Sequence, residues 1–310
     1  MREELSGTQN IVDAYREDVY SEDAFTVYLG DCVKHLRDME SDSFDYSIFS
    51  PPFADLFVYS NSDHDMGNCR DDKEFIAQMR YMIAELYRTM KPGRNVSVHC
   101  MNLPTTKMRQ GYIGLRDFRG DLIRAFQEVG FIYHSEVCIW KDPVVAMQRT
   151  KALGLLHKTI RENSTMTRMG LPDYVVTLRK PGELDERVTH QHPDDLPVQL
   201  WQKYASPVWM DIDQSRTLNR MPARDENDEK HMCPLQLDVI ERCIHLWTNK
   251  GDVVFSPFTG IGSEGYCAVR MGRRFVGTEL KPQYWELAVA NIKDAKREQQ
   301  DLFADLDMAA

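Results

Sequence analysis

The feature that most constrains this chain is a regular alternation of short apolar segments with longer amphipathic segments. Strands are predicted at residues 25–30, 44–49, 95–100, 131–140, 173–178, 252–256 and 275–280. Helical patterns lie between several of them, at residues 71–90, 117–130 and 234–247 and in the stretch that follows Gly262. Strands that alternate with helices of this length predict an α/β fold, with a mostly parallel sheet and helices on both of its faces.

Residues 142–230 interrupt this alternation. This segment is richer in charge, glycine and proline, and it includes PGELDERVTHQHPDD, which is typical of an exposed loop. We therefore expect a recognition insertion and linker at 142–230, between segments 1–141 and 231–310 of the main domain. The strand predicted at 173–178 is compatible with the insertion and with the main sheet. A length of 310 residues suits one large domain that carries such an insertion.

The charge of the chain is unevenly distributed. The net charge is −10, but residues 101–180 contain thirteen Lys or Arg and seven Asp or Glu, a local balance of +6 that leaves −16 for the remainder. Such segregation is compatible with one basic face that binds a polyanion. It is equally compatible with charges that fall by chance on solvated helix faces, so charge alone does not identify a nucleic-acid-binding protein.

The composition disfavours several classes of protein. No apolar run approaches the roughly 18 residues of a transmembrane helix, and the N-terminal MREELSGTQN lacks the apolar core of a signal peptide. The seven cysteines form no CxxC pair, which indicates reduced thiols and a cytoplasmic protein. The HQH sequence has no third ligand nearby, so no metal site is predicted. His99 and His134 lie in predicted strands and are expected to be satisfied core or edge histidines rather than general bases.

A glycine-rich turn follows the strand predicted at 252–256. In SPFTGIGSEGYCAVRMGRRFVGTEL, Gly260, Gly262 and Gly265 match the pattern GxGxxG, and Glu279 lies nineteen residues after Gly260. That spacing is typical of a dinucleotide-binding turn, in which glycines allow close approach of the backbone and the acid binds ribose hydroxyls. On this pattern alone, a nicotinamide-dependent oxidoreductase and a plain strand–turn–helix connection both remain open.

Two segments together resemble the DNA amino-methyltransferases, which use S-adenosyl-L-methionine. The turn Ser256-Pro257-Phe258-Thr259-Gly260-Ile261-Gly262 resembles the family's cofactor turn, with Ser256 where Asp is usual. Ser50-Pro51-Pro52-Phe53 resembles its catalytic tetrapeptide, Asp/Asn/Ser-Pro-Pro-aromatic. The tetrapeptide comes first, the recognition region next and the cofactor turn last, which is the order of the family's β group. The resemblance implies a Rossmann-like methyltransferase fold, with a catalytic half at 1–141 and a cofactor-binding half at 231–310.

The residue types of the tetrapeptide suit methylation of a base amine. Such an amine is a poor nucleophile because its lone pair is delocalised into the ring. Two acceptors on its N–H bonds, the Ser50 hydroxyl and the Pro51 carbonyl, would draw the nitrogen towards a tetrahedral shape and free that lone pair. Pro51 and Pro52 fix the carbonyl and remove competing backbone donors. Phe53 offers a face on which an extruded base stacks. Taken alone, a Ser-Pro-Pro loop without activity explains the same four residues.

The resemblance also implies a set of cofactor-binding residues. Asp31 matches an acid that contacts the adenine, and Glu279 matches the acid that binds the ribose. The helix after Pro234 helps to hold the methionine end, and because the usual Lys-Pro is Cys233-Pro234 here, His231 is expected to supply the polar contact. The predicted cofactor-binding residues are Asp31, Phe255, Pro257, Phe258, Gly260, Gly262, Ser263, Glu279, His231 and Pro234.

The basic stretch at 141–170 is the predicted DNA contact. Its cations are expected to bind phosphates, while some Arg or Gln side chains read base edges; they are Arg149, Lys151, Lys158, Arg161 and Arg168. A surface helix over VVAMQRTKALGLLHKTI, with its apolar side on the core, explains the same pattern structurally. The loop at 59–72 is expected to order over the extruded base or to be an inert surface loop.

We therefore predict a methyltransferase that acts on an exocyclic amine in double-stranded DNA. Serine at the first tetrapeptide position is usual in N4-cytosine enzymes, so N4 of cytosine is predicted and N6 of adenine is the alternative. RNA or a protein glutamine amide as substrate, and a DNA-binding module without catalysis, are further alternatives. No membrane partner is expected, and the sequence leaves open a homodimer and a cognate restriction endonuclease.

Overall fold

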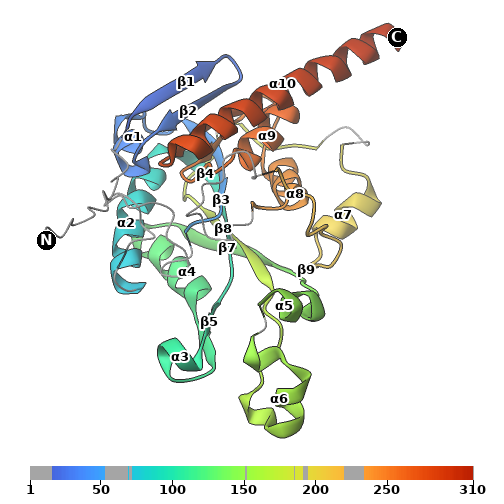
Figure 1. Ribbon diagram of the computed structural model, residues 1–310. Coiled ribbons are helices and arrows are strands. Elements are labelled where there is room, and N and C mark those ends of the chain that lie inside the picture. The colour runs from blue at the N-terminus through green and yellow to red at the C-terminus, as the bar shows by residue number, and fades with distance from the viewer. Residues whose placement is uncertain are drawn as a thin grey trace, which may run out of the picture.

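The computed structural model describes residues 16–52, 69, 72–150, 152–184, 186–190, 195–219 and 234–309 of the 310-residue chain. In this part of the chain, nine strands form one sheet in the order β1-β2-β11-β10-β3-β4-β8-β7-β9 (Figure 1). In that order they are β1 (Asp18–Glu22), β2 (Phe25–Leu29), β11 (Arg274–Glu279), β10 (Val253–Ser256), β3 (Phe44–Phe49), β4 (Met90–Cys100), β8 (Asp173–Arg179), β7 (Ile132–Ile139) and β9 (Val208–Trp209).

The sheet is mostly parallel, which confirms the predicted α/β fold. The strands β2, β11, β10, β3 and β4 are parallel to one another, whereas β8 is antiparallel to both β4 and β7. The strand predicted at 173–178 therefore belongs to the main sheet. The edge strand β1, which pairs antiparallel with β2, was not predicted because its sequence DVYSE is polar and mostly exposed.

Helices cover both faces of the sheet (Figure 1). On one face lie α1 (Cys32–Asp38), α2 (Asp72–Thr89) and α4 (Phe118–Val129), and on the other lie α8 (Leu237–Trp247), α9 (Ser263–Arg270) and α10 (Pro282–Ala309). The central strand β3 is buried along its whole length, and a register shift between Phe44 and Tyr46 sends these two rings into opposite cores. A strand covered on both faces reads as an unbroken apolar run, as β3 does. Within the described residues, no helix is both long and apolar enough to cross a membrane.

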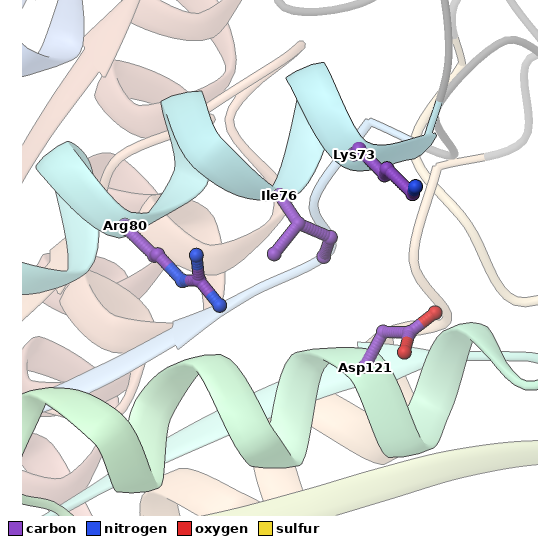
Figure 2. A pocket seen from close by; sticks show the side chains of 4 residues that line it. All are labelled: Lys73, Ile76, Arg80 and Asp121. Atoms are coloured by element: carbon purple, nitrogen blue, oxygen red, sulfur yellow. The ribbon is translucent and has the colours of Figure 1, made fainter.

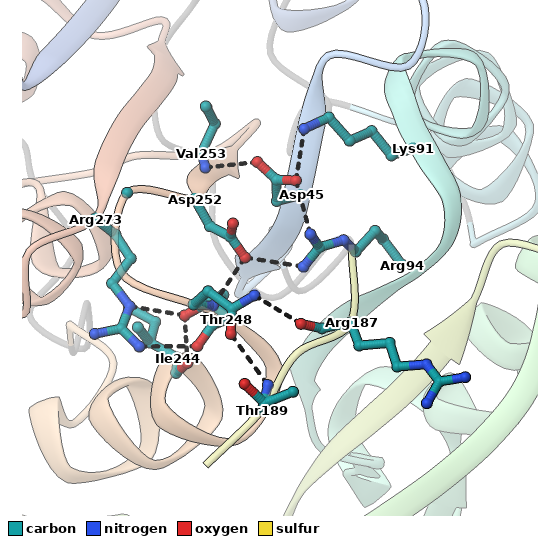
Figure 3. Close-up of polar contacts among 12 residues, drawn as sticks. Asp45, Lys91, Arg94, Arg187, Thr189, Ile244, Thr248, Asp252, Val253 and Arg273 are labelled. Atoms are coloured by element: carbon teal, nitrogen blue, oxygen red, sulfur yellow. Dashed lines mark hydrogen bonds and ion pairs between the residues drawn. The ribbon is translucent and has the colours of Figure 1, made fainter. Parts of the chain in front are cut away.

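A buried ionic cluster joins β3, β4 and β10 at the edge where these strands begin (Figure 3). The guanidinium of Arg94 lies between two carboxylates, 3.1 Å from Asp45 Oδ1 and 2.8 Å from Asp252 Oδ2. Asp45 also accepts a hydrogen bond from the Val253 N–H, at 2.9 Å, and pairs with the Lys91 ammonium at 2.7 Å. This cluster fixes the relative positions of three strands that come from distant parts of the chain.

The same edge holds part of the predicted exposed loop. Asn249 donates from its side-chain amide to the Arg187 carbonyl, at 2.9 Å, and accepts from the Thr189 N–H, at 3.1 Å. Figure 3 labels the two loop residues, Arg187 and Thr189. The segment 186–190 has no helix or strand, in agreement with the prediction, yet these two bonds tie its backbone to the main domain.

The predicted surface helix at 144–160 is wrong as one element. The structure has α5 (Pro143–Thr150), a 3₁₀ turn (Leu153–Leu155), α6 (His157–Glu162) and a second 3₁₀ turn (Ser164–Met166). The chain folds back at Gly154, whose carbonyl accepts a hydrogen bond from the Arg168 N–H at 3.0 Å. A Cβ at Gly154 would lie 3.2 Å from side-chain atoms of Arg168 and Ile113, so glycine allows this close return.

Four further short elements lie outside the two helical layers. The strands β5 (Leu103–Thr105) and β6 (Gly114–Arg116) pair antiparallel around α3 (Lys107–Gln110), and α7 (Val198–Tyr204) precedes β9. In Figure 1, β5, α3, α5 and α6 all extend from the lower end of the sheet. The strands β4 and β7 both pair antiparallel with β8, so they run in the same direction. Both of them finish at this lower end of the sheet.

Candidate active site

The predicted site residues gather where the parallel strands end. Ser50 follows β3, Ser256 ends β10, Glu279 ends β11, and Asp31 comes two residues after β2. The chain leaves β3 for β4 on one side and leaves β10 for β11 on the other, so the order of the sheet reverses between β3 and β10. Open α/β sheets bind their ligands at such a reversal, outside the carboxyl ends of the strands. The predicted catalytic and cofactor-binding segments thus lie at adjacent strand ends, where the order of the sheet reverses.

The predicted catalytic corner begins at Ser50, a half-buried residue directly after the buried strand β3. Its Oγ lies 3.1 Å from His99 Nδ1 and, more distantly, 3.5 Å from the His99 carbonyl oxygen. Pro51 is buried and Pro52 is half-buried, and neither has an N–H that could compete for the acceptors of a substrate. Phe53 lies outside the described residues, as does the loop at 59–72 apart from Cys69 and Asp72.

A buried polar chain continues behind Ser50. His99, 8% exposed, lies near the end of β4, and its Nε2 is 3.0 Å from Asp173 Oδ2 at the start of β8. Lys141 forms an ion pair with the same carboxylate. Burial raises the pKa of Asp173, but the hydrogen bond and charge of His99, together with Lys141, outweigh burial and hold that pKa below its usual value. His99 is a satisfied buried histidine, as predicted, and one of its two partners is the predicted catalytic serine.

No pattern in the sequence indicates this polar chain. His99 and Asp173 are brought together by the antiparallel pairing of β4 with β8, in which His99 lies opposite Val175 and Cys100 opposite Tyr174. A sequence pattern predicts that both segments are strands, but it does not predict which strands pair or in what register.

The glycine turn is held in shape from two sides. Gly262 has φ +90°, and a Cβ there would lie 2.9 Å from Ala288 Cα on α10, so both conformation and space require glycine. Gly260 has φ +54°, and a Cβ there would meet no described atom within 4 Å. The Gly260 N–H donates to Glu279 Oε2 at 2.7 Å, which joins the turn to the end of β11. The turn therefore presents backbone to an open space at the strand ends.

The two predicted acids also have structural partners. Glu279 accepts the Lys281 N–H at its other oxygen, at 2.9 Å, and its carbonyl accepts the Gly30 N–H at 2.8 Å. Asp31 is the N-cap of α1 and accepts from the Val33 and Lys34 N–H groups, at 2.7 and 3.0 Å. These bonds fix the orientation of both carboxylates at neighbouring strand ends.

The remaining predicted cofactor residues differ in how they lie. Phe258 is half-buried, and its ring lies 5.7 Å from that of Phe49, so it links the glycine turn to the end of β3. The Phe255 side chain is fully buried and stacks on Phe44 at 4.4 Å, so only its backbone can reach a ligand. Pro257 is buried and its carbonyl accepts from the Thr278 hydroxyl, at 2.7 Å. The others are Ser263, buried at the start of α9, half-buried Pro234, and His231, which lies outside the described residues.

Two buried polar groups at the turn bear on whether a ligand fits. The Ser256 hydroxyl is fully buried and has no hydrogen-bond partner among the described residues. Glu264, in the first turn of α9, is also buried, and burial, with a smaller contribution from the charge of Glu279, raises its pKa to about 8. A carboxyl with that pKa is largely protonated at pH 7. The turn therefore combines an open backbone at Gly260 with an unsatisfied hydroxyl and a neutral acid, which suits a ligand that forms hydrogen bonds.

The predicted DNA-binding residues lie apart from the catalytic corner. Lys158 and Arg161 are exposed on α6, and Lys158 lies 3.6 Å from Glu162. Arg168 is half-buried and donates to the Met169 carbonyl at 3.2 Å, and its desolvation lowers its pKa. The side chain of Arg149, on α5, and the whole of Lys151 lie outside the described residues.

A surface hollow lies elsewhere, between α2 and α4. Its described lining residues are Lys73, Ile76 and Arg80 from α2 and Asp121 from α4 (Figure 2). None of these residues belongs to the predicted catalytic corner or to the glycine turn. The lining combines two cations with one carboxylate, so it presents no single sign of charge. We therefore do not assign the site to this hollow.

Sequence comparisons identify relatives over most of the chain. A family model described as DNA methylase matches residues 44–290. The type II methyltransferase M.BglII from Bacillus subtilis is 22% identical over 277 residues, which cover 84% of this chain and 67% of that protein. The DNA adenine methyltransferase YhdJ from Escherichia coli (strain K12) is 24% identical over 277 residues, which cover 88% of this chain and 84% of that protein.

Solved structures share the fold. A Thermus thermophilus protein described as a putative DNA modification methylase, in complex with S-adenosyl-L-methionine, has a TM-score of 0.66 at 21% identity and covers 86% of this chain and 92% of its own. The PvuII DNA methyltransferase, described as cytosine-N4-specific, has a TM-score of 0.63 at 17% identity and covers 91% of this chain and 94% of its own. At these identities the likeness is one of architecture.

Proposed function

This chain belongs to the DNA methylase family, whose enzymes depend on S-adenosyl-L-methionine, and we propose that it methylates N4 of cytosine in double-stranded DNA. The observation that carries the proposal is the meeting of Ser50-Pro51-Pro52 with the glycine turn at the adjacent ends of β3 and β10. This arrangement supports the proposal, because it would place an acceptor for the base amine next to the bound cofactor.

The roles of the residues follow from their chemistry. The cofactor, when bound, supplies a methyl group made electrophilic by the sulfonium charge. Asp31 and Glu279 would hold its adenosine part, since carboxylates accept from ribose and adenine donors. Gly260 leaves room for close approach, and the Ser256 hydroxyl gains a partner there. The protonated Glu264 avoids a further unpaired charge in this buried place.

The target amine would be held at the catalytic corner. Ser50 Oγ and the Pro51 carbonyl accept its two hydrogen bonds, and Phe53 stacks on the extruded base. Choice of N4 of cytosine rests on serine at position 50, the residue type usual in N4 enzymes. N6 of adenine is the second candidate, because the amine chemistry is the same and the Escherichia coli relative is named as an adenine enzyme.

The insertion is proposed to contact the duplex. Lys158 and Arg161 on α6 are exposed cations at the end of the sheet where β4 and β7 finish, and cations in such a position bind phosphates. Some relatives are named as type II methyltransferases, which supports a restriction endonuclease as a functional partner, and we include this partner in the proposal. We also include a homodimer as the alternative to a monomer.

The test is direct identification of the methylated product. Purified protein is incubated with tritiated S-adenosyl-L-methionine and mixed unmethylated duplex DNA, and the digested nucleosides are analysed by mass spectrometry. The Ser50→Ala, Phe53→Ala double variant runs beside it, with Ser21→Ala, an exposed serine of β1, as the matched control. We expect N4-methylcytosine with the unmodified protein and the control and none with the double variant.

The other outcomes separate the alternatives. N6-methyladenine would keep the mechanism and refute the choice of base. Bound cofactor in calorimetry without any methylated nucleoside would shift the substrate to RNA or a protein amide. A protein that binds no S-adenosyl-L-methionine would refute the enzyme activity itself.

A further inference from the structure

Asp173, His99 and Ser50 form a continuous series of hydrogen bonds. Asp173 Oδ2 lies 3.0 Å from His99 Nε2, and His99 Nδ1 lies 3.1 Å from Ser50 Oγ. The side chain of Asp173 is 3% exposed and that of His99 is 10% exposed, so neither group readily exchanges these partners for bulk water. Lys141 adds a cation at the same carboxylate oxygen, Oδ2.

The protonation of this chain follows from the pKa of Asp173. Because that pKa is held below its usual value, the carboxylate is ionised and only accepts hydrogen bonds at neutral pH. In a neutral imidazole, the nitrogen that faces the carboxylate is then the protonated one, and Nδ1 is the acceptor. The Ser50 hydroxyl donates its single proton to Nδ1, the nearer of its two acceptors on His99. The lone pairs of Ser50 Oγ are thereby left to accept from a substrate N–H.

We propose that His99 and Asp173 are positioning residues for methyl transfer, which hold Ser50 as a hydrogen-bond acceptor and remove, through it, the proton that the methylated amine must lose. This inference rests on the proposed function and adds to it a path for the proton. Ser50 is the group that contacts the amine, and the other two act through Ser50.

The proton transfer balances without any further reactant. When the amine nitrogen forms its bond to the methyl carbon, the bond between that carbon and the sulfonium sulfur would break, with its electron pair left on a neutral thioether. The amine would then carry the positive charge and one proton that it must lose. That proton passes to Ser50 Oγ as the Ser50 hydroxyl proton passes to His99 Nδ1. The products are a neutral methylated amine, an intact serine and an imidazolium that pairs with the Asp173 carboxylate. The imidazolium returns its proton to water after the product leaves.

A second buried polar pair in the same strands provides the matched control. Ser97 Oγ and Thr177 Oγ1 lie 3.1 Å apart, between β4 and β8, further into the sheet than His99 and Asp173. This pair also joins the two strands, but it lies outside the path from Asp173 to Ser50. Removal of the Ser97–Thr177 hydrogen bond therefore measures how the loss of any buried bond between β4 and β8 affects the rate.

The experiment measures methyl transfer in a single turnover, with cofactor and duplex DNA saturating. His99→Asn keeps an acceptor for Ser50 but cannot take up a proton at pH 7, and we expect the rate to fall about 100-fold. The dissociation constants for S-adenosyl-L-methionine and DNA are expected to stay within about twofold. Ser50→Ala combined with His99→Asn should be no slower than the slower single variant, because both act in one path. Thr177→Val should leave the rate within about twofold.

The dependence of the rate on pH is a readout that a purely structural histidine would not move. Protonated His99 cannot accept from Ser50, so the rate of the unmodified protein should fall on the acid side. Around the ring, the described ionisable groups are Asp173 and Lys141, the neighbouring Cys100, whose pKa is raised by burial, and further out the Arg119–Glu136 pair. Lys141→Met removes the cation that opposes ring protonation, so the acid limb should move to higher pH.

Each outcome decides the inference. A His99→Asn protein that transfers methyl at the unmodified rate, or an additive double variant, would overturn it while leaving the proposed function intact. If His99→Asn does not fold, an acid limb that stays in place in Lys141→Met overturns it equally. If the unmodified protein methylates no DNA, the proposed function fails and the inference falls with it.

Discussion

Replacing Arg94 by methionine removes the cation that lies between the buried carboxylates of Asp45 and Asp252. The three side chains are 5%, 3% and 9% exposed, so water cannot take the place of the guanidinium. Removal of one partner from a buried ionic cluster costs about 3–5 kcal/mol, a large part of the roughly 5–15 kcal/mol that stabilises a typical domain. We expect Arg94→Met to lower the free energy of unfolding by that amount at pH 8.

The loss should depend on pH in a direction that the structure fixes. Burial already raises the pKa of Asp252, and the charge of Asp45 adds to this, while Arg94 opposes it. Without Arg94 the pKa of this carboxyl rises further, so the stability it contributes is present at low pH and is lost as pH rises through the raised pKa. The difference between Arg94→Met and the unmodified protein should therefore be smaller at pH 5 than at pH 8.

Urea unfolding followed by circular dichroism at both pH values measures these differences. Lys91→Met is the matched control, because Lys91 contacts the same Asp45 carboxylate at 2.7 Å but is 40% exposed. An exposed partner of this kind contributes below about 1 kcal/mol. The reasoning is refuted if Arg94→Met loses no more stability than Lys91→Met, or if its loss is the same at pH 5 and pH 8.

Three further predictions concern the turn and the insertion. Burial raises the pKa of Glu264 from its ordinary value near 4.5 to about 8. The free energy of unfolding should therefore fall as pH rises between those values, by up to about 1.4 kcal/mol per pH unit. Glu264→Gln should flatten this dependence, which thermal unfolding from pH 5 to 9 measures. Glu279→Gln should weaken S-adenosyl-L-methionine binding about 10- to 100-fold in calorimetry, the loss of one charged hydrogen bond, and unchanged affinity would contradict its assignment. Lys158→Ala and Arg161→Ala should each reduce the slope of log affinity for duplex DNA against log salt by up to about 0.9, measured by fluorescence anisotropy, whereas Arg297→Ala on α10 should not.

The order and type of the main elements could be predicted from the sequence, because they depend on local periodicity. The strands at 25–30, 44–49 and 275–280 agree with β2, β3 and β11 to within one residue at each end. The family was also identified correctly, because the two motifs that indicate it are contiguous runs of a few residues. Motifs of this kind can be recognised from consecutive residues alone, without knowing how the strands pair.

The parts that could not be predicted depend on tertiary pairing. The Ser50–His99–Asp173 chain exists only because β8 enters the sheet antiparallel to β4, in one register. The Phe255 side chain faces the core rather than the cofactor turn, and this depends on which face of β10 each residue occupies. The broken helix at 144–160 depends on the packing of Gly154 against Arg168, two residues that no local pattern relates.

The pairing of Ile139 with Asp173 has a consequence for how this architecture could diversify. The segment 140–172 leaves the sheet at the end of β7 and returns at the start of β8, and its two ends lie opposite each other in the ladder. A segment with adjacent ends can be exchanged for another of different length without a change in strand order. The connection between β7 and β8 can thus change in length and sequence while the sheet stays the same, provided that Lys141 and Asp173 at its two ends keep their ion pair.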